Sequence, residues 1–216
     1  MFVINFERVI NCTLSLQILT KYKIVAIIVV VIILREGYYI KSIIDEFKPL
    51  YQKSKNYKNW IAIIDEHTCF ICRSNHGRIF KIDEELQLLP PVHNKCRCTI
   101  ELMRAIKAGN ATVDGVDYYV KTNRKLPDCY ISVEEAKALG WKPFLGNLDK
   151  VAPEKLLTNG VFQNREHKLP EKNGRIWYEA DINYSRGFRN SMRIVFSDDG
   201  LVFVTYDHYQ TFYEII

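Results

Sequence analysis

The C-terminal half contains four segments that decide its fold: Ile176-Trp-Tyr-Glu-Ala-Asp-Ile182, Ser191-Met-Arg-Ile-Val-Phe196, Leu201-Val-Phe-Val-Thr205 and Gln210-Thr-Phe-Tyr-Glu-Ile215. Each segment is short and rich in β-branched and aromatic residues, which predicts four consecutive strands. Two helices are expected before them, over Val113 to Thr122 and Ser132 to Leu139. Helices followed by strands indicate an α+β domain in which N-terminal helices pack on an antiparallel β-sheet.

The length and composition are those of a globular protein. The chain has 216 residues, of which 48% are hydrophobic and 25% charged, with 10 Gly and 7 Pro. These values exclude disordered and collagen-like proteins. The net charge of +5 comes from residues 1–106, which hold 15 basic and 10 acidic residues, because residues 107–216 hold 15 of each. Bulk charge therefore gives no reason to expect nucleic-acid binding by the C-terminal half.

The N-terminal half is expected to be helical, with a small Cys/His loop module. An apolar run extends from Ile24 to Leu34, which is shorter than the ~20 residues that a membrane-spanning helix needs. A buried element, a membrane anchor and a secretory signal all remain open for this run, so membrane contact through it is possible. Apolar residues spaced by three and four predict a helix over Tyr38 to Lys58, and another short helix is expected over Thr99 to Ala108.

Four of the six cysteines fall within one 30-residue window. A Cys-x2-Cys pair suits tetrahedral zinc, and soft sulfur ligands with an imidazole favour zinc over magnesium or calcium. Two disulfides in an exported protein, or reduced and buried thiols, are the alternatives. The candidate ligands of a structural zinc ion are Cys69, Cys72, His93, Cys96 and Cys98.

The same window carries a family resemblance. The string Asp65-Glu66-His67-Thr68-Cys69-x2-Cys72, then His76-Gly77, then Pro90-Pro91-x-His93-x2-Cys96-Arg97-Cys98 resembles the C-terminal signature of phage head morphogenesis (minor capsid, Mu-F-like) proteins. Such segments also precede the toxic domain of bacterial polymorphic toxins. The resemblance implies a role in delivery or assembly.

Four polar residues in or near the predicted strands form a set that can catalyse phosphodiester transfer: Glu179, Arg189, Arg193 and His208. A carboxylate can remove the proton of a 2′-hydroxyl, and an imidazolium can protonate the leaving 5′-oxygen. Two guanidinium groups can stabilise the charge that develops on the phosphate. The 2′-hydroxyl would then distinguish RNA from DNA. Alone, the set is more typical of surface ion pairs and satisfied polar groups than of a catalytic site.

A second resemblance covers the last 105 residues. The segments Lys125-Leu126-Pro127-Asp128, Val151-Ala152-Pro153, Asn164-Arg165-Glu166, Glu179-Ala180-Asp181-Ile182-Asn183-Tyr184, Gly187-Phe188-Arg189-Asn190-Ser191 and Asp207-His208-Tyr209-Gln210-Thr211-Phe212 resemble the barnase-like family of bacterial guanyl-specific ribonucleases. The resemblance implies that Glu179 is the general base and His208 the general acid, that Arg189 and Arg193 bind phosphate, and that no cofactor is needed for catalysis. It implies guanine recognition by Phe162, Gln163, Asn164, Arg165 and Glu166, with Tyr209 against the base.

The sequence departs from this family at two places. Family members have a lysine near the phosphate, where this chain has Val133, and Lys137 or Lys168 are the candidates to replace its charge. Loss of a cation there would remove stabilisation of the transition state. Gln163 replaces a small hydroxyl residue in the guanine loop, which bears on the strictness of base preference.

These observations predict three regions: an apolar and basic helical region over residues 1–59, a phage-head-like Cys/His segment over 60–104, and a ribonuclease domain over 105–216. We expect a guanyl-specific endoribonuclease that cleaves single-stranded RNA, acts as a toxin, is secreted or delivered out of a bacterial cell, and is bound by an acidic, barstar-like immunity protein. An inactive assembly protein is the alternative, supported by Val133. A zinc-dependent nuclease centred on His93 ranks last, because the segment lacks the carboxylates of hydrolytic zinc sites.

Overall fold

The computed structural model describes residues 50–216. Its N-terminal part contains β1 (Tyr51–Ile61), α4 (Phe70–Asn75), β2 (Ile79–Lys81) and β3 (Thr99–Ile106). The C-terminal part contains α5 (Val116–Asn123), β4 (Tyr130–Ser132), α6 (Val133–Ala138), η1 (Pro143–Leu145), α7 (Leu148–Val151), β5 (Leu156–Phe162), β6 (Trp177–Asp181), β7 (Arg193–Ser197), β8 (Val202–Thr205) and β9 (Tyr213–Ile215).

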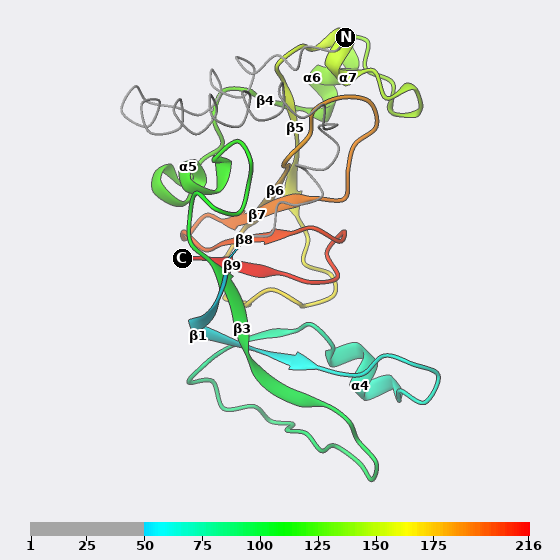
Figure 1. Cartoon of the computed structure of the whole chain (residues 1–216), viewed down its shortest axis with the longest axis vertical. Coiled ribbons are helices and arrows are strands. Elements are labelled where there is room, and N and C mark those ends of the chain that lie inside the picture. Colours follow the sequence, from blue (N-terminus) through cyan, green and yellow to red (C-terminus); the bar gives the residue numbers. More distant parts are fainter. Residues whose placement is uncertain (1–49) are drawn as a thin grey trace, which may run out of the picture.

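The nine strands of residues 50–216 belong to one sheet, in the order β2-β1-β3-β9-β8-β7-β6-β5-β4. The neighbours from β5 to β9 pair antiparallel, whereas β3 pairs parallel with β9 and β4 pairs parallel with β5. The expected α+β architecture with an antiparallel sheet is therefore confirmed. Figure 1 shows α4 and the strands β1 and β3 at one end of the sheet, and α6 and α7 at the other.

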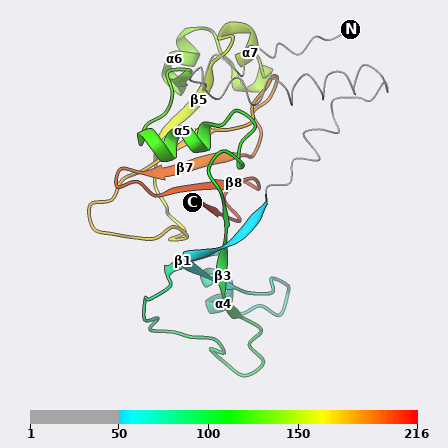
Figure 2. The same cartoon turned by 60° about the vertical axis from the view of Figure 1, so that its left-hand side comes forward.

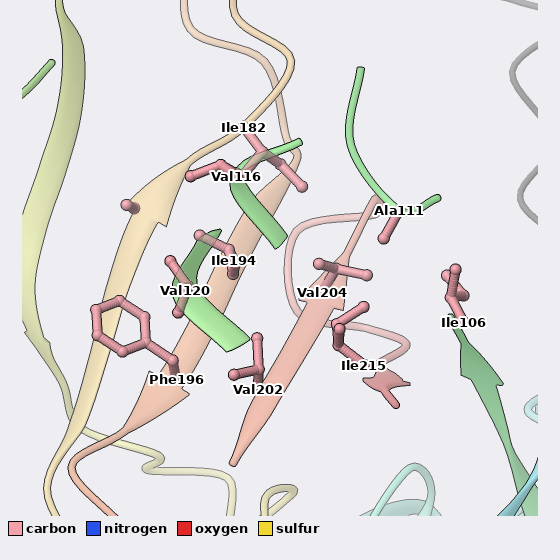
Figure 3. Close-up of a cluster of buried hydrophobic side chains, with 11 residues drawn as sticks. Ile106, Ala111, Val116, Val120, Ile182, Ile194, Phe196, Val202, Val204 and Ile215 are labelled. Carbon is pink, nitrogen blue, oxygen red and sulfur yellow. The ribbon is translucent and has the colours of Figure 1, made fainter. Parts of the chain in front are cut away.

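The central strands are buried on both faces. Side chains alternate along a strand, so Ile194 and Phe196 of β7 join one hydrophobic cluster while Val195 joins another. Helix α5 covers the first face (Figure 2), where its Val116 and Val120 lie in one cluster with Ile182 and Ile194 (Figure 3).

The second face is covered from the N-terminal part of the chain. Tyr57 of β1, Ile79 of β2 and Met103 of β3 are buried in one cluster with Trp177 and Phe203. Tyr57 and Phe203 meet edge to face, with ring centroids 5.7 Å apart. The segment that resembles phage proteins and the C-terminal domain thus share a hydrophobic core.

The expected helices at residues 51–58 and 99–108 are wrong, because these residues form β1 and β3. In β1 the buried residues Ser54, Tyr57 and Trp60 recur at every third position, which imitates a helical period. Between Lys53 and Lys58 the pairing of β1 with β3 is irregular, with five positions on β1 for two on β3, and this interrupts the alternation of side chains. Tyr57 and Trp60 follow in regular strand and join different clusters, so they are buried on opposite faces.

The other expected elements are confirmed within a few residues. Helix α6 begins with a capping box, in which the Ser132 hydroxyl accepts from the Glu135 amide at 3.1 Å and the Glu135 carboxylate accepts from the Ser132 amide at 2.7 Å. Among residues 50–216, no helix has the length and apolar character needed to cross a membrane. The apolar run at residues 24–34 lies outside the described residues.

Candidate active site

Strand β6 presents two carboxylates on the face opposite α5. Glu179 and Asp181 are two positions apart, so they share the face of Trp177, which packs against the N-terminal strands. Glu179 lies opposite Val195 of β7, and Asp181 lies opposite Arg193. Glu179 is half-buried, whereas Asp181 is buried.

Asp181 binds both predicted phosphate-binding arginines. Arg189 donates to it through Nε and Nη2, each at 2.7 Å, and Nη2 also donates to Asn159 at 3.0 Å. Arg193 Nε lies 3.0 Å from Asp181 Oδ1 without the alignment of a hydrogen bond, so this contact is electrostatic. Nη1 of Arg189 has no hydrogen-bond partner among residues 50–216 and can still donate to a ligand.

The loop that carries Arg189 is held by local contacts. The Tyr184 hydroxyl donates to the Gly187 carbonyl at 2.9 Å, and the Gly187 amide donates to Asp149 at 3.2 Å. Gly146 packs against this loop so closely that an added Cβ would lie 2.8 Å from the Phe188 nitrogen. Arg189 is therefore presented by a fixed turn.

His208 and Tyr209 both adopt left-handed backbone conformations, with φ of 57° and 67°. This conformation is uncommon for residues other than glycine and persists only where the surroundings enforce it. Here the Tyr209 amide donates to Thr205 Oγ1 at 3.0 Å, and the Asp207 carboxylate accepts from the Thr211 amide at 2.9 Å. These contacts fix the direction of the His208 and Tyr209 rings.

Tyr209 connects the two expected catalytic groups. Its hydroxyl donates to Glu179 Oε2 at 2.7 Å, and its ring centroid lies 4.8 Å from that of His208. The ring also stacks on Phe162 at 5.2 Å. Burial, and secondarily the Glu179 carboxylate, raise the pKa of Tyr209 well above its usual value, so the hydroxyl keeps its proton and acts as a donor.

The loop after β5 is shaped by Asn164. Its side chain donates to the Leu169 carbonyl and accepts from the Leu169 amide, both at 3.0 Å. Lys168 then reaches back, donating to the Tyr209 carbonyl at 2.9 Å and pairing with Glu166 at 2.7 Å. The Glu166 side chain remains 74% exposed, so its carboxylate is available to a ligand.

These groups surround one cavity of about 280 Å³. The lining residues come from the end of β5 and the loop after it, from β6 and from the turn before β9: Val161, Phe162, Gln163, Asn164, Arg165, Glu166, Lys168, Glu179, Tyr209 and Phe212. The structure therefore brings Glu179 and Tyr209 into one pocket with all five residues expected to recognise guanine. Arg189, Arg193 and His208 do not line this pocket; the two arginines contact Asp181, and the His208 ring contacts that of Tyr209.

Three features of the site were not apparent from sequence. The side chain of Asn164 is used within the loop, so it supports the pocket from inside. Asp181 is the common partner of the two arginines, and its position two residues after Glu179 was the available signal. Of the two lysines considered as substitutes for Val133, Lys168 lines the pocket and Lys137 does not.

The cysteine and histidine side chains also come together. Cys72 Sγ lies 3.3 Å from His93 Nε2 and 3.7 Å from Cys96 Sγ. Potential ligand atoms of Cys69, Cys72 and His93 lie within 4.8 Å of one another, as do those of Cys72, Cys96 and Cys98. All four of these cysteines are free thiols in this structure, and disulfides were one of the alternatives that the sequence left open.

The N-terminal segment contacts the pocket loop directly. The Ile79 amide donates to the Lys168 carbonyl at 2.8 Å. A Cβ on Gly77 would lie 3.4 Å from the Gln210 carbonyl oxygen and 3.5 Å from Cε of Lys168. The chain around β2 thus supports the residue that joins Glu166 to Tyr209.

Comparisons with known proteins match both parts of the chain. A family model described as ribonuclease matches residues 114–216, and one described as Phage Mu protein F like protein matches residues 44–101. A ribonuclease of Heyndrickxia coagulans is 52% identical over 104 residues, which are 48% of this chain and 95% of the relative. Ribonucleases of Bacillus intermedius and Bacillus pumilus are also 52% identical over 104 residues, and this chain covers 64% of each.

Proposed function

The chain belongs to the ribonuclease family, and from this premise we propose that its C-terminal domain cleaves single-stranded RNA after guanine. The reaction is a transphosphorylation that yields a 2′,3′-cyclic phosphate, followed by hydrolysis of that ester. The observation that carries the proposal is the shared pocket of Glu179, Tyr209 and the loop after β5, with Arg189 beside it. The acid of this proposal is His208, whose ring lies 4.8 Å from that of Tyr209, and its phosphate-binding cations are the two arginines that contact Asp181.

Glu179 is the general base. Its carboxylate removes the 2′-hydroxyl proton while the 2′-oxygen attacks phosphorus, and the bond to the 5′-oxygen breaks. His208 is the general acid and protonates that leaving oxygen, as an imidazolium can near neutral pH. In the second step the roles reverse: His208 removes a proton from water, and Glu179 returns a proton to the 2′-oxygen.

Arg189 and Arg193 stabilise the charge that develops on the phosphate. The free Nη1 of Arg189 donates to a non-bridging oxygen, while Asp181 fixes the guanidinium plane from behind. The Arg193 side chain is only 6% exposed. We therefore assign Arg193 mainly an electrostatic contribution and Arg189 the direct contact.

The loop after β5 selects the base. Guanine presents a ring N–H and an exocyclic amine side by side, and a carboxylate can accept from both. Glu166 supplies that carboxylate at the pocket, and its ion pair with Lys168 holds it there. Phe162 and Tyr209, whose rings already stack, offer a flat apolar surface for the base.

The test uses the purified full chain and RNA oligomers that contain one guanine or, as a matched substrate, one adenine. We expect one cut, 3′ to guanine, and a cyclic phosphate detected by mass spectrometry. Glu179→Ala and His208→Ala should each abolish cleavage. Glu134→Ala, an exposed change on α6, is the matched control and should cut like the wild type.

Three other outcomes would contradict parts of this proposal. A folded wild-type protein that leaves the guanine oligomer intact would contradict the enzymatic proposal and favour an assembly role. Equal cleavage after adenine would contradict base selection by Glu166. Cleavage that EDTA abolishes would favour a metal-dependent nuclease.

We propose further that this ribonuclease serves as a toxin delivered out of a bacterial cell and neutralised by an acidic, barstar-like immunity protein. The match of residues 44–101 to a phage protein family supports a delivery or assembly role for the preceding segment. Arg165 and His208, which are exposed, offer the inhibitor a local basic surface.

Expression of the wild type should stop bacterial growth, expression of Glu179→Ala should not, and co-expressed barstar should restore growth. Growth arrest by Glu179→Ala would contradict the toxin role.

A further inference from the structure

We infer that Cys69, Cys72, His93 and Cys96 bind one zinc ion. The ion would join two segments that are distant in sequence, the turn that begins α4 and the loop that precedes β3. This structural site lies outside the ribonuclease pocket. The zinc proposal therefore goes beyond the proposed function and can be tested independently of it.

Two distances from Cys72 suit tetrahedral zinc. Zn–S bonds of about 2.3 Å and Zn–N bonds of about 2.0 Å place neighbouring sulfurs about 3.8 Å apart and a sulfur and a nitrogen about 3.6 Å apart. The distance from Cys72 Sγ to Cys96 Sγ is 3.7 Å, and the distance from Cys72 Sγ to His93 Nε2 is 3.3 Å. The ligand atoms form two groups that share Cys72: those of Cys69, Cys72 and His93 lie within 4.8 Å of one another, and so do those of Cys72, Cys96 and Cys98. A bound ion would therefore draw Cys96 toward Cys69 and His93 around Cys72.

His93 is oriented as a metal ligand. Its Nδ1 lies 2.7 Å from the carbonyl oxygen of Asn94. Because a carbonyl can only accept, Nδ1 carries the proton and Nε2 presents its lone pair to Cys72. A ligating histidine whose second nitrogen donates to a carbonyl is the usual arrangement in metal sites. This orientation places His93 in the ligand set, and the 3.7 Å contact of Cys96 with Cys72 makes Cys96 the fourth ligand in our assignment.

The turn that carries the Cys-x2-Cys pair is also arranged for ligation. Cys69 is the N-cap of α4, and its sulfur accepts a hydrogen bond from the Cys72 amide at 3.4 Å. Such a bond places both sulfurs on the same side of the turn and favours the thiolate that binds metal.

An ion pair joins the two ligand segments independently of the cysteines. Arg97 donates to both carboxylate oxygens of Asp65, each at 2.7 Å. Asp65 lies four residues before Cys69, and Arg97 directly follows Cys96. A bidentate pair of this kind fixes relative orientation as well as distance. The ligand segments are thus held in place by a contact that needs no metal.

The hydrophobic cluster beneath the site is small. Its fully buried members are Trp60, Ala62 and Cys72. Small modules with so little buried apolar surface commonly depend on a structural metal. Sulfur and imidazole ligands favour zinc over magnesium and calcium. The ion would therefore stabilise the segment that supports Lys168.

The test measures zinc in the full chain purified under reducing conditions, by mass spectrometry of the metal. We expect one equivalent in the wild type and in Cys98→Ser, the matched control. Cys72→Ser and His93→Ala should each lose most of it. Wild-type protein without zinc, even after incubation with zinc chloride, would overturn the site. Zinc retained by His93→Ala but lost by Cys98→Ser would overturn the ligand assignment.

A second measurement uses the wild type alone, so that the test does not depend on whether the variants fold. Cobalt(II) is titrated into metal-free wild-type protein, and the visible absorption bands are recorded. Tetrahedral cobalt bound by thiolates gives intense bands, which should saturate at one equivalent and disappear when zinc is added. A spectrum typical of octahedral cobalt would contradict the proposal. RNA cleavage by the same samples is measured in parallel, so that a failure of the ribonuclease proposal is seen separately.

Discussion

Arg189 donates two hydrogen bonds to the carboxylate of Asp181, through Nε and Nη2, and both are 2.7 Å long. Asp181 is 1% exposed and also faces Arg193. A carboxylate between two guanidinium groups compensates their charge, and its removal leaves two cations without a counter-charge. Loss of one partner of a buried ion pair typically costs about 3–5 kcal/mol.

We predict that Asp181→Asn lowers the free energy of unfolding by about 3 kcal/mol. Urea denaturation followed by tryptophan fluorescence measures this change. The exposed Asp83→Asn is the control and should remain near the wild-type value. RNA cleavage should also fall, because Arg189 loses the group that fixes its plane. An unchanged midpoint for Asp181→Asn would mean that water compensates the two arginines.

The second prediction concerns the hydroxyl of Tyr209. Tyr209→Phe removes the 2.7 Å hydrogen bond to Glu179 and keeps the ring on Phe162. Hydrogen bonds to charged groups contribute about 1.5–3 kcal/mol. We therefore expect kcat/KM to fall by about tenfold or more, with KM nearly unchanged.

The comparison variant is Tyr209→Ala, which also removes the stacking surface and should raise KM. Steady-state cleavage of a guanine dinucleotide gives both parameters. If Tyr209→Phe cleaved faster than the wild type, the hydroxyl would instead restrain Glu179 before substrate binds.

The C-terminal strands could be predicted from sequence because their signals are local. Segments from β6 to β9 are apolar and bounded by turn residues, and Glu179 and His208 fall on or beside them. Strand β5 was missed because Gly160 and Asn159 lower its strand propensity, yet pairing with β6 on one side and β4 on the other stabilises it.

The N-terminal strands could not be predicted for a different reason. The burial of β1 at every third residue resembles a helix, and the pairing of β3 with β9 joins residues more than 100 positions apart. Asp181 lies within a motif of the family, but its burial between two arginines depends on Arg189, in a loop eight residues away. Such contacts are properties of the folded chain and leave no local pattern.

The third prediction separates Asn164 from its neighbour. Asn164→Ala removes two hydrogen bonds to Leu169 at a residue that is 8% exposed, so we expect a loss of about 1–3 kcal/mol in stability. The loop should also lose its shape, which would raise KM for guanine substrates. Gln163→Ala, in the exposed neighbouring position, should change neither quantity by as much. Similar KM values for the two variants would contradict a role of Asn164 in shaping the pocket.

The fourth prediction is a dependence of stability on pH. Asp199 accepts hydrogen bonds from Nε and Nη2 of Arg175, each at 2.8 Å. These bonds, with others from Ser197 and Lys172, hold the pKa of Asp199 below its usual value. A lowered pKa in the folded state contributes stability above the unfolded pKa of about 3.9, and this contribution is lost as the pH falls through the folded value.

Asp199→Asn should therefore be less stable than the wild type at pH 7, and the difference should shrink steadily below about pH 4. Thermal unfolding at a series of pH values measures it, with Asp83→Asn again as the control. A difference in stability that stays constant down to acidic pH would contradict a contribution from the charge of the Asp199 carboxylate.

The last prediction restores a cation near the phosphate site. Val133 begins α6 directly after Ser132, which pairs with Thr158 on β5. The next residue on β5, Asn159, accepts from Arg189. A lysine at position 133 would thus add positive charge beside the arginines, and each tenfold gain in rate corresponds to about 1.4 kcal/mol of transition-state stabilisation. We expect Val133→Lys to raise kcat up to about tenfold. Val133→Met, which is longer but uncharged, separates the effect of charge from that of packing against the cluster of Trp141 and Leu148. Equal changes of kcat in both variants would show that position 133 does not face the phosphate. A loss of stability in Val133→Lys without a gain in kcat would show the same, and Lys168 would then be the cation of this pocket.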